Sequence, residues 1–369
     1  MWRTCAPADR CASGVERLLI GGERFQVNLR NTELDCANLY RLTMGRLRAD
    51  LGDARRLVIS PDGALAEIPW EALRNANGRY LVDAGYRITY LDSAGSLVHP
   101  PAPTAPRGPA VVIAQVDYDG KPRTAALASS PEELAWVTEE RPAGVAGMPA
   151  AGWKPLRGGE EILRTLDDLR QAGRMARVEK LPLGSKDEVM ALNQPLALIA
   201  HTHGFFRANA AGAGGGGLDS GIVLYGANRA SGDGWLMAKE MMLLNLQGTE
   251  LVALLGCDTG RGMEAGEGIQ GLRHALAVAG ARSTLLTLWQ VGDLSAARFL
   301  RELLTRLVTG AGKPLETAMA ETQLAFLRGE VREANRPAES NRWRHPYFWA
   351  AATLAGEGGT LHLSTAPSK

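Results

Sequence analysis

The chain has 369 residues, 45% of them hydrophobic, and its 41 Lys and Arg side chains nearly balance 40 Asp and Glu. Such a length is enough for two or three domains that bury their own cores without disulfides or a structural metal. The near-neutral charge argues against a direct nucleic-acid binder, because contact with the phosphate backbone needs a basic surface.

The four cysteines are too few for a disulfide framework, and the start of the chain has no signal-peptide core. No apolar run approaches the roughly 18 residues of a membrane span. We therefore expect a cytoplasmic protein without membrane contact.

The first part of the chain predicts a small α/β region. Leucines spaced as in an amphipathic helix predict a single helix over 34–51, packed onto the rest of the chain. Apolar runs at 56–59 and 64–70 predict strands. Between them Pro61, Asp62 and Gly63 indicate a turn.

A proline-rich segment follows, with five prolines among residues 99–109. Proline fits neither a helix interior nor a central strand, so this segment reads as a linker. We expect an N-terminal α/β region at 1–107, integral to the fold, and the main domain at 108–369.

In the main domain, apolar runs alternate with helical patterns. The runs that predict buried strands are 110–116, 177–181, 196–201, 250–256, 283–289 and 347–354. The predicted helices are 160–173, 235–246, 267–279, 294–308 and 315–329. This alternation predicts an α/β/α sandwich with a mostly parallel six-stranded sheet.

Ligands of parallel sheets bind beyond the carboxyl ends of the strands, where two segments carry reactive side chains. His203 follows the strand at 196–201, and Cys257 follows the strand at 250–256. An imidazole close to a thiol favours the thiolate and later protonates the leaving amine. The backbone N–H groups of Gly204 and Cys257 are candidates for an oxyanion hole. The alternative is structural, with Cys257 as a small core residue and His203 as a packed strand-end histidine.

A second interpretation of the same segments is a zinc site. His201 and His203 have the spacing of residues on one face of a strand, and Cys257 with Asp258 would complete four ligands. The signal is weak without a third spaced ligand, and we expect His201 to be packed at the sheet edge. The glycine-rich segment 210–217 has no Gly-Lys-Ser/Thr ending, which excludes a phosphate-binding P-loop.

The sequence from about 55 to 356 resembles a CHAT domain, a caspase-like peptidase family related to separase. The resemblance is carried by an ordered set of short motifs. They are LVISPDGAL (57–65), PWEAL (69–73), AHTHG (200–204), LLGCDTG (254–260), GEGI (266–269), AGARS (279–283), LWQV (288–291) and HPYFWA (345–350).

The resemblance implies a caspase-like fold and a cysteine endopeptidase with a His203–Cys257 dyad. Gly204 matches an oxyanion donor. Gly256 and Asp258 stand where the family motif has Ala and Glu, and both changes are small. No metal or cofactor is implied.

The resemblance also implies a substrate preference. In separase-like relatives the loop after the fifth strand walls the S1 pocket, and an acidic residue there accepts a basic P1 side chain. Trp289 and Asp293 occupy that loop here. Asp293 also directly precedes a predicted helix, where a carboxylate is a good N-cap, and both roles can hold.

The partners expected from these features are a protein substrate and a separate regulatory or activating protein. CHAT domains usually follow helical repeats that sense a partner, and residues 1–54 show no repeat. Activation would come from another protein or from self-cleavage, for which segment 210–217 is a candidate gate. The expected setting is bacterial regulated proteolysis or defence. The alternative from another class is a catalytically inactive caspase-like scaffold or binding module.

Overall fold

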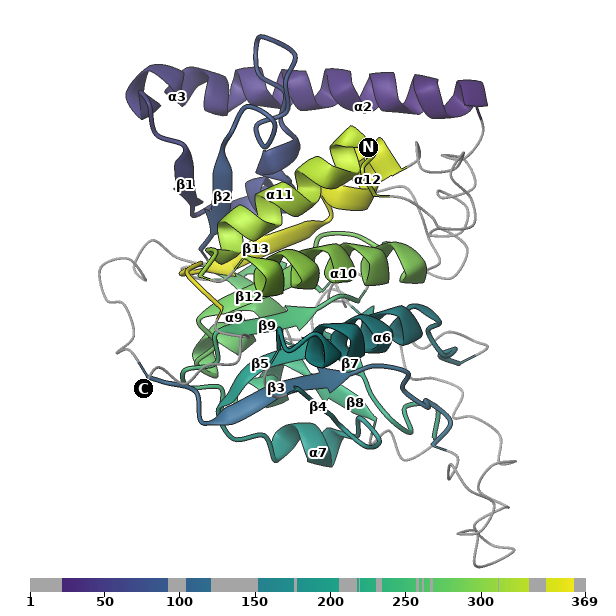
Figure 1. Ribbon diagram of the computed structural model, residues 1–369. Coiled ribbons are helices and arrows are strands. Elements are labelled where there is room, and N and C mark those ends of the chain that lie inside the picture. The colour runs from purple at the N-terminus through teal and green to yellow at the C-terminus, as the bar shows by residue number, and fades with distance from the viewer. Residues whose placement is uncertain are drawn as a thin grey trace, which may run out of the picture.

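The central feature is an eight-stranded sheet in the order β1-β2-β13-β12-β9-β5-β3-β4 (Figure 1). Its strands are β1 Arg56–Ile59, β2 Arg87–Tyr90, β3 Gly108–Ile113, β4 Val178–Lys180, β5 Pro195–Ala200, β9 Leu251–Leu254, β12 Ser283–Thr287 and β13 Ala352–Gly356. The computed structural model describes residues 22–91, 104–120, 152–175, 178–205, 218, 220–229, 234–256, 259–260, 262–265, 268–310, 312–331 and 343–361.

The sheet is mostly parallel, as predicted. Strands β4, β3, β5, β9 and β12 run in one direction, and β13 pairs antiparallel with β12. Strand β2 continues the sheet beside β13, and β1 pairs parallel with β2. Strands on both sides of position 107 therefore share one sheet, which gives it two strands more than the six predicted.

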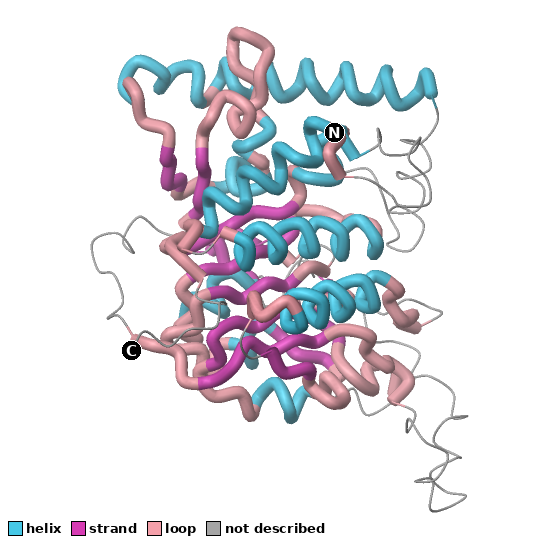
Figure 2. The backbone as a smooth tube through the Cα atoms, viewed as in Figure 1, coloured by secondary structure: helices cyan, strands magenta, loops and turns pink. Residues whose placement is uncertain are grey.

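Helices cover both faces of the sheet, so the fold is an α/β/α sandwich as predicted (Figures 1 and 2). The helices of the first face are α6 Gly158–Gln171, α10 Asp293–Thr309, α11 Leu315–Arg328 and α12 Pro346–Trp349. The helices of the second face are α7 Lys186–Met190, α8 Ala238–Met241 and α9 Leu272–Val278.

Alternate strand residues supply the two cores. Val112 and Ile199 are buried in the core that holds α6, α10 and α11, whereas Ile113 and Leu198 are buried in the core that holds α7, α8 and α9. This period of two follows from the pleat of a strand covered on both sides.

A third core lies at the end of the sheet formed by strands β1 and β2. Helices α2 Gly22–Leu42 and α3 Met44–Leu51 lie across this end (Figure 1), and the short 3₁₀ helices η1 Gly63–Glu67 and η2 Trp70–Ala72 follow β1. Met44, Leu57, Trp70 and Ile88 are buried together there. The single helix predicted over 34–51 is therefore two helices, separated at Thr43.

Two smaller sheets complete the described fold. One contains β6 Gly204–Phe205, β7 Gly221–Val223 and β8 Trp235–Met237, and the other is the hairpin of β10 Gly262–Ala265 and β11 Gly268–Gly271. Each begins after a central strand of the main sheet: β6 follows β5 in the chain, and β10 follows β9. Within the described ranges, no helix has both the length and the apolar character needed to span a bilayer.

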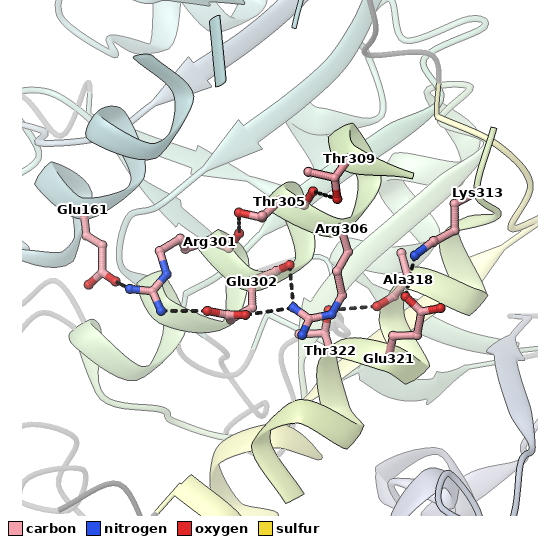
Figure 3. A network of polar contacts seen from close by, with 10 residues as sticks. All are labelled: Glu161, Arg301, Glu302, Thr305, Arg306, Thr309, Lys313, Ala318, Glu321 and Thr322. Carbon is pink, nitrogen blue, oxygen red and sulfur yellow. Dashed lines mark hydrogen bonds and ion pairs between the residues drawn. The ribbon is translucent and has the colours of Figure 1, made fainter. Parts of the chain in front are cut away.

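A line of charged side chains ties α6 to α10 on the outer side of these helices (Figure 3). Arg301 contacts Glu161 at 2.6 Å and Glu302 at 2.7 Å, and Arg306 contacts Glu302 at 2.8 Å. Burial would raise the pKa of Glu302, but hydrogen bonds from Arg306 and Arg301 outweigh it and lower that pKa. Because Glu161 lies in the first turn of α6, the network holds that end of the helix against α10.

Four of the predicted elements are wrong in type over all or part of their length. The predicted strand over 64–70 consists of 3₁₀ turns, and the start of the predicted strand over 347–354 is helix α12. The His345 side chain accepts a hydrogen bond from the Tyr347 N–H and Pro346 occupies the first turn, so the chain is helical before β13 begins. The predicted helix over 235–246 begins instead with strand β8, and the predicted helix over 267–279 begins with strand β11.

Candidate active site

The carboxyl ends of β5 and β9 meet at one edge of the sheet. The strands pair in parallel with Ala200 opposite Leu254, and the Leu255 N–H donates to the Ala200 carbonyl at 3.1 Å. The sheet therefore brings the described residues that follow β5 and β9 to the same edge.

Gly256 lies directly against the histidine segment. A Cβ atom built on Gly256 would lie 2.6 Å from the Thr202 carbonyl oxygen and 2.8 Å from the Gly204 nitrogen. Only a residue without a side chain fits this approach. Cys257 and Asp258 follow immediately in the chain, and both lie outside the described residues, as does segment 210–217.

The His203 ring contacts two aromatic rings. Its ring centroid lies 5.2 Å from that of Tyr118 and 5.0 Å from that of Trp153. Its Nε2 atom lies 2.8 Å from the Lys154 carbonyl oxygen. A carbonyl only accepts, so Nε2 carries the hydrogen and Nδ1 is the basic nitrogen of the neutral ring.

Thr202 anchors the turn that carries His203. Its hydroxyl donates to the Val223 carbonyl and accepts from the Tyr118 hydroxyl at 2.9 Å. Both groups belong to segments that pack beside β5 and not to β5 itself. The turn starts where strand β5 ends, and the two hydrogen bonds of the Thr202 side chain hold its backbone in place.

Gly204 has the geometry of an available backbone donor. The Val223 N–H donates to the His203 carbonyl at 3.0 Å, and the next pair of the β6–β7 ladder is Gly204 with Ile222. In an antiparallel ladder the pair after a bonded pair is the non-bonded kind, whose N–H groups point away from the partner strand. The Gly204 N–H therefore points away from β7, on the side where Gly256 approaches.

His201 is buried at 1% exposure and does not share the surroundings of His203, which confirms its packed position at the sheet edge. Its Nε2 atom lies 3.3 Å from Asp293 Oδ1 and 3.4 Å from the Asp293 carbonyl oxygen. Its Nδ1 atom has no hydrogen-bond partner. Burial lowers the pKa of His201 against the attraction of Asp293, so the ring is neutral at pH 7.

Asp293 caps a helix, but not the one predicted. It is the first residue of α10, whose N-cap is Gly292 without a side-chain hydrogen bond. Its carboxylate instead accepts from the backbone N–H groups of Arg157 at 2.6 Å and Gly158 at 2.9 Å, at the start of α6. The predicted cap of its own helix is therefore wrong.

Trp289, the other residue predicted for the S1 pocket, is 8% exposed. Its indole N–H donates to the Tyr347 carbonyl at 3.1 Å, and the two rings stack with centroids 6.4 Å apart. The S1 roles of Trp289 and Asp293 stay predictions.

The zinc interpretation has no second observation in its favour. Within the described part of the chain, no group of three His, Cys, Asp or Glu side chains is arranged to hold a metal. The two histidines proposed as ligands contact different groups, His201 the Asp293 carboxylate and His203 the Lys154 carbonyl.

Four residues that the sequence did not single out surround His203 or hold its neighbours: Tyr118, Trp153, Lys154 and Asn228. Lys154 contributes a carbonyl, which every residue has, so no sequence signal marks it. The two aromatic residues stand outside any motif that we identified.

Comparison with known proteins gives one family. The sequence matches the CHAT domain over residues 34–357, which is most of the chain. A comparison with curated protein sequences gave no match.

Two solved structures show the level of similarity. The Saccharomyces cerevisiae separase–securin complex is 14% identical with a TM-score of 0.44, and the match covers 80% of this chain but only 15% of that one. The complex of the pro- and mature domains of Porphyromonas gingivalis RgpB is 12% identical with a TM-score of 0.47, covering 92% of this chain and 73% of that one. Neither likeness is close enough to carry a conclusion about activity. The match over 34–357 shows that the chain belongs to the CHAT domain family.

Proposed function

We propose that this chain is a cysteine endopeptidase that cleaves a partner protein with a His203–Cys257 dyad. The observation that carries the proposal is the close approach of Gly256 to Thr202 and Gly204. A Cβ atom built on Gly256 would lie 2.6 Å from the Thr202 carbonyl oxygen and 2.8 Å from the Gly204 nitrogen. This approach puts the residue before Cys257 against the residues on either side of His203. The proposed dyad needs no metal or cofactor.

The tautomer of His203 supports its role as the base. With Nε2–H donated to the Lys154 carbonyl, Nδ1 holds the lone pair that accepts the thiol proton. The Cys257 thiolate then attacks the carbonyl carbon of the scissile peptide bond. The protonated His203 returns this proton to the leaving amine, and the acyl group remains on the sulfur as a thioester.

Water completes the cycle. His203 takes a proton from a water molecule, which attacks the thioester carbonyl, and the thiol is regenerated as the new carboxyl group leaves. Both tetrahedral intermediates carry a negative oxygen, which we assign to the N–H groups of Gly204 and Cys257. The outward direction of the Gly204 N–H relative to β7 supports this assignment.

The substrate part of the proposal is a protein cut after a basic P1 residue, as predicted from Asp293, with a separate protein that regulates the cleavage. Fluorogenic peptides with Arg, Lys, Ala or Asp at P1 test this preference directly. Regulated proteolysis in a bacterial defence system is the setting we propose for it.

A peptidyl probe with a thiol-reactive group tests the nucleophile. Cys257 should be labelled selectively over the other cysteines. Cys36 serves as an internal control, because it is 5% exposed and burial raises the pKa of its thiol to about 12.

Cys257→Ala and His203→Ala should each abolish peptide cleavage, while the circular dichroism spectrum and melting temperature stay those of the wild type. Undiminished cleavage by either variant contradicts the proposal. An unlabelled Cys257 together with inactivity on every peptide would favour the inactive scaffold instead.

A further inference from the structure

The segment that orients His203 is short and is fixed at both ends. We call residues 152–158 the strap. Near its start the strap supplies the Lys154 carbonyl, 2.8 Å from His203 Nε2, and the Trp153 ring beside the imidazole. It ends where helix α6 begins, at Gly158.

The first anchor of the strap is Asn228, which is 8% exposed. Its Oδ1 atom accepts from the Trp153 N–H at 2.7 Å, and its Nδ2 donates to the Trp153 carbonyl at 2.9 Å. A single amide side chain thus satisfies both main-chain groups of the residue before Lys154. The Nδ2 group also donates to Asp119 Oδ1 at 2.7 Å, which fixes the orientation of the amide.

The second anchor is Asp293. Its two carboxylate oxygens take the N–H groups of Arg157 and Gly158, which as the first amides of α6 have no partner within the helix. From the buried side, His201 Nε2 lies 3.3 Å from Asp293 Oδ1 and 3.4 Å from the Asp293 carbonyl oxygen.

Helices α6 and α10 are in tight contact where they begin, at Gly158 and Asp293. A Cβ atom on Gly158 would lie 2.6 Å from Asp293 Oδ1 and 2.6 Å from the Ala297 Cβ. The strap therefore cannot shift at its C-terminal end without breaking the hydrogen bonds to Asp293. The strap residues that the two anchors hold lie within a few residues of Lys154: Trp153 at one end, Arg157 and Gly158 at the other.

We propose that Asp293 and Asn228 are positioning residues, which fix the strap so that the Lys154 carbonyl holds His203 with Nδ1 as its basic atom. This inference rests on the proposed function for its catalytic meaning. The role that it assigns to Asp293 acts through the strap and does not require contact with the P1 side chain of a substrate.

The test compares Asp293→Asn and Asn228→Ala with the control Glu160→Gln in the full chain. Glu160 lies in the first turn of α6, the helix whose first amides Asp293 caps, but its side chain is 69% exposed and pairs with Arg164. The control removes the same negative charge near this helix start without touching the strap.

Kinetics separate positioning from P1 binding. We expect each anchor variant to lower kcat about 10- to 100-fold for peptides with Arg, Lys and Ala at P1 alike, with KM close to that of the wild type. Glu160→Gln should match the wild type. A loss confined to Arg and Lys peptides and expressed in KM would overturn the inference for Asp293 and establish the S1 role.

Two measurements do not require activity. Nitrogen-15 spectra of the histidine rings should show the Nε2–H tautomer of His203 in the wild type and a mixture of tautomers in the anchor variants. Hydrogen exchange of the strap amides should accelerate at the same time. If the wild type cleaves no peptide, the proposed function fails while these spectra still decide the role of the anchors. An unchanged His203 tautomer and unchanged exchange of the strap amides in both variants would overturn the positioning role of Asp293 and Asn228. Should Asp293→Asn not fold, Asn228→Ala gives the same comparison from the other anchor.

Discussion

The carboxyl group of Glu71 is buried, and its ionisation should make the free energy of unfolding depend on pH. It is 2% exposed, and its Oε2 accepts from the Tyr90 hydroxyl at 2.6 Å, while Oε1 has no partner. The Arg273 guanidinium, whose charge acts to lower the pKa of Glu71, lies over the Tyr90 ring at 5.7 Å from its centroid. Burial outweighs the hydrogen bond from Tyr90 and raises the pKa of Glu71 from 4.5 to about 7.

The direction of the effect follows from proton binding. Between pH 4.5 and about 7 the folded chain keeps the Glu71 proton and the unfolded chain releases it, so the free energy of unfolding falls as pH rises. The pKa difference corresponds to about 3 kcal/mol in total at about 1.4 kcal/mol for each pKa unit, most of it lost between pH 5 and 8. Glu71→Gln keeps an acceptor for Tyr90 and cannot ionise. The variant should therefore be more stable than the wild type by about 3 kcal/mol at pH 8, and by about 1 kcal/mol or less at pH 5.

Urea unfolding at pH 5 and pH 8, followed by tryptophan fluorescence, measures this difference. Because other groups titrate in both proteins, only the change in the variant minus wild-type difference counts. Asp62→Asn, at an exposed position nearby in the chain, is the control and should show the same difference at both pH values. A Glu71→Gln difference that does not grow from pH 5 to pH 8 would refute the reasoning, since it would mean that Glu71 is already ionised in the fold at pH 5.

Three further changes test contacts near the site and between the helices. Gly256→Ala places a methyl group 2.6 Å from the Thr202 carbonyl, so it should cost about 1–3 kcal/mol of unfolding free energy and lower peptide cleavage; an unchanged melting temperature and rate would show that the turn yields freely. Tyr118→Phe removes the donor to the Thr202 hydroxyl and should cost about 1 kcal/mol in the same assay, with a native-like spectrum. Arg301→Gln breaks the network of Figure 3 and should cost about 1 kcal/mol or less, a difference that shrinks in 1 M salt; equal losses at both salt levels would assign the effect to packing.

The parts of the site that depend on strand register were predictable from the sequence. Apolar runs on consecutive positions identify β5 and β9 as strands buried on both faces, and parallel neighbours bring the residues after them to one edge. The stripe of Leu300, Leu303, Leu304 and Leu307 identified helix α10 in the same way, and all four side chains are buried. In each case the period of the side chains is the physical cause of the structure.

The parts that failed depend on contacts that no local pattern contains. The run that begins at Tyr347 is apolar throughout, so its period does not separate strand from helix, and the cap by His345 decides. The N–H groups that donate to the Asp293 carboxylate were assigned to the wrong helix for a related reason. A carboxylate at a helix start satisfies whichever orphan N–H groups lie nearest, and here these belong to α6, whose position only the tertiary fold determines.

The contact of His203 with the Lys154 carbonyl would be hard to detect by mutagenesis. The Lys154 side chain is exposed, and its contribution comes from an atom that mutation cannot remove. A scan of single substitutions at position 154 would therefore find tolerance and pass over the contact. Inserting or deleting one residue between Trp153 and Gly158 would move the carbonyl away from the imidazole while leaving every named side chain intact. At this point of the molecule the chain length between two anchors, and not the identity of a residue, carries the constraint.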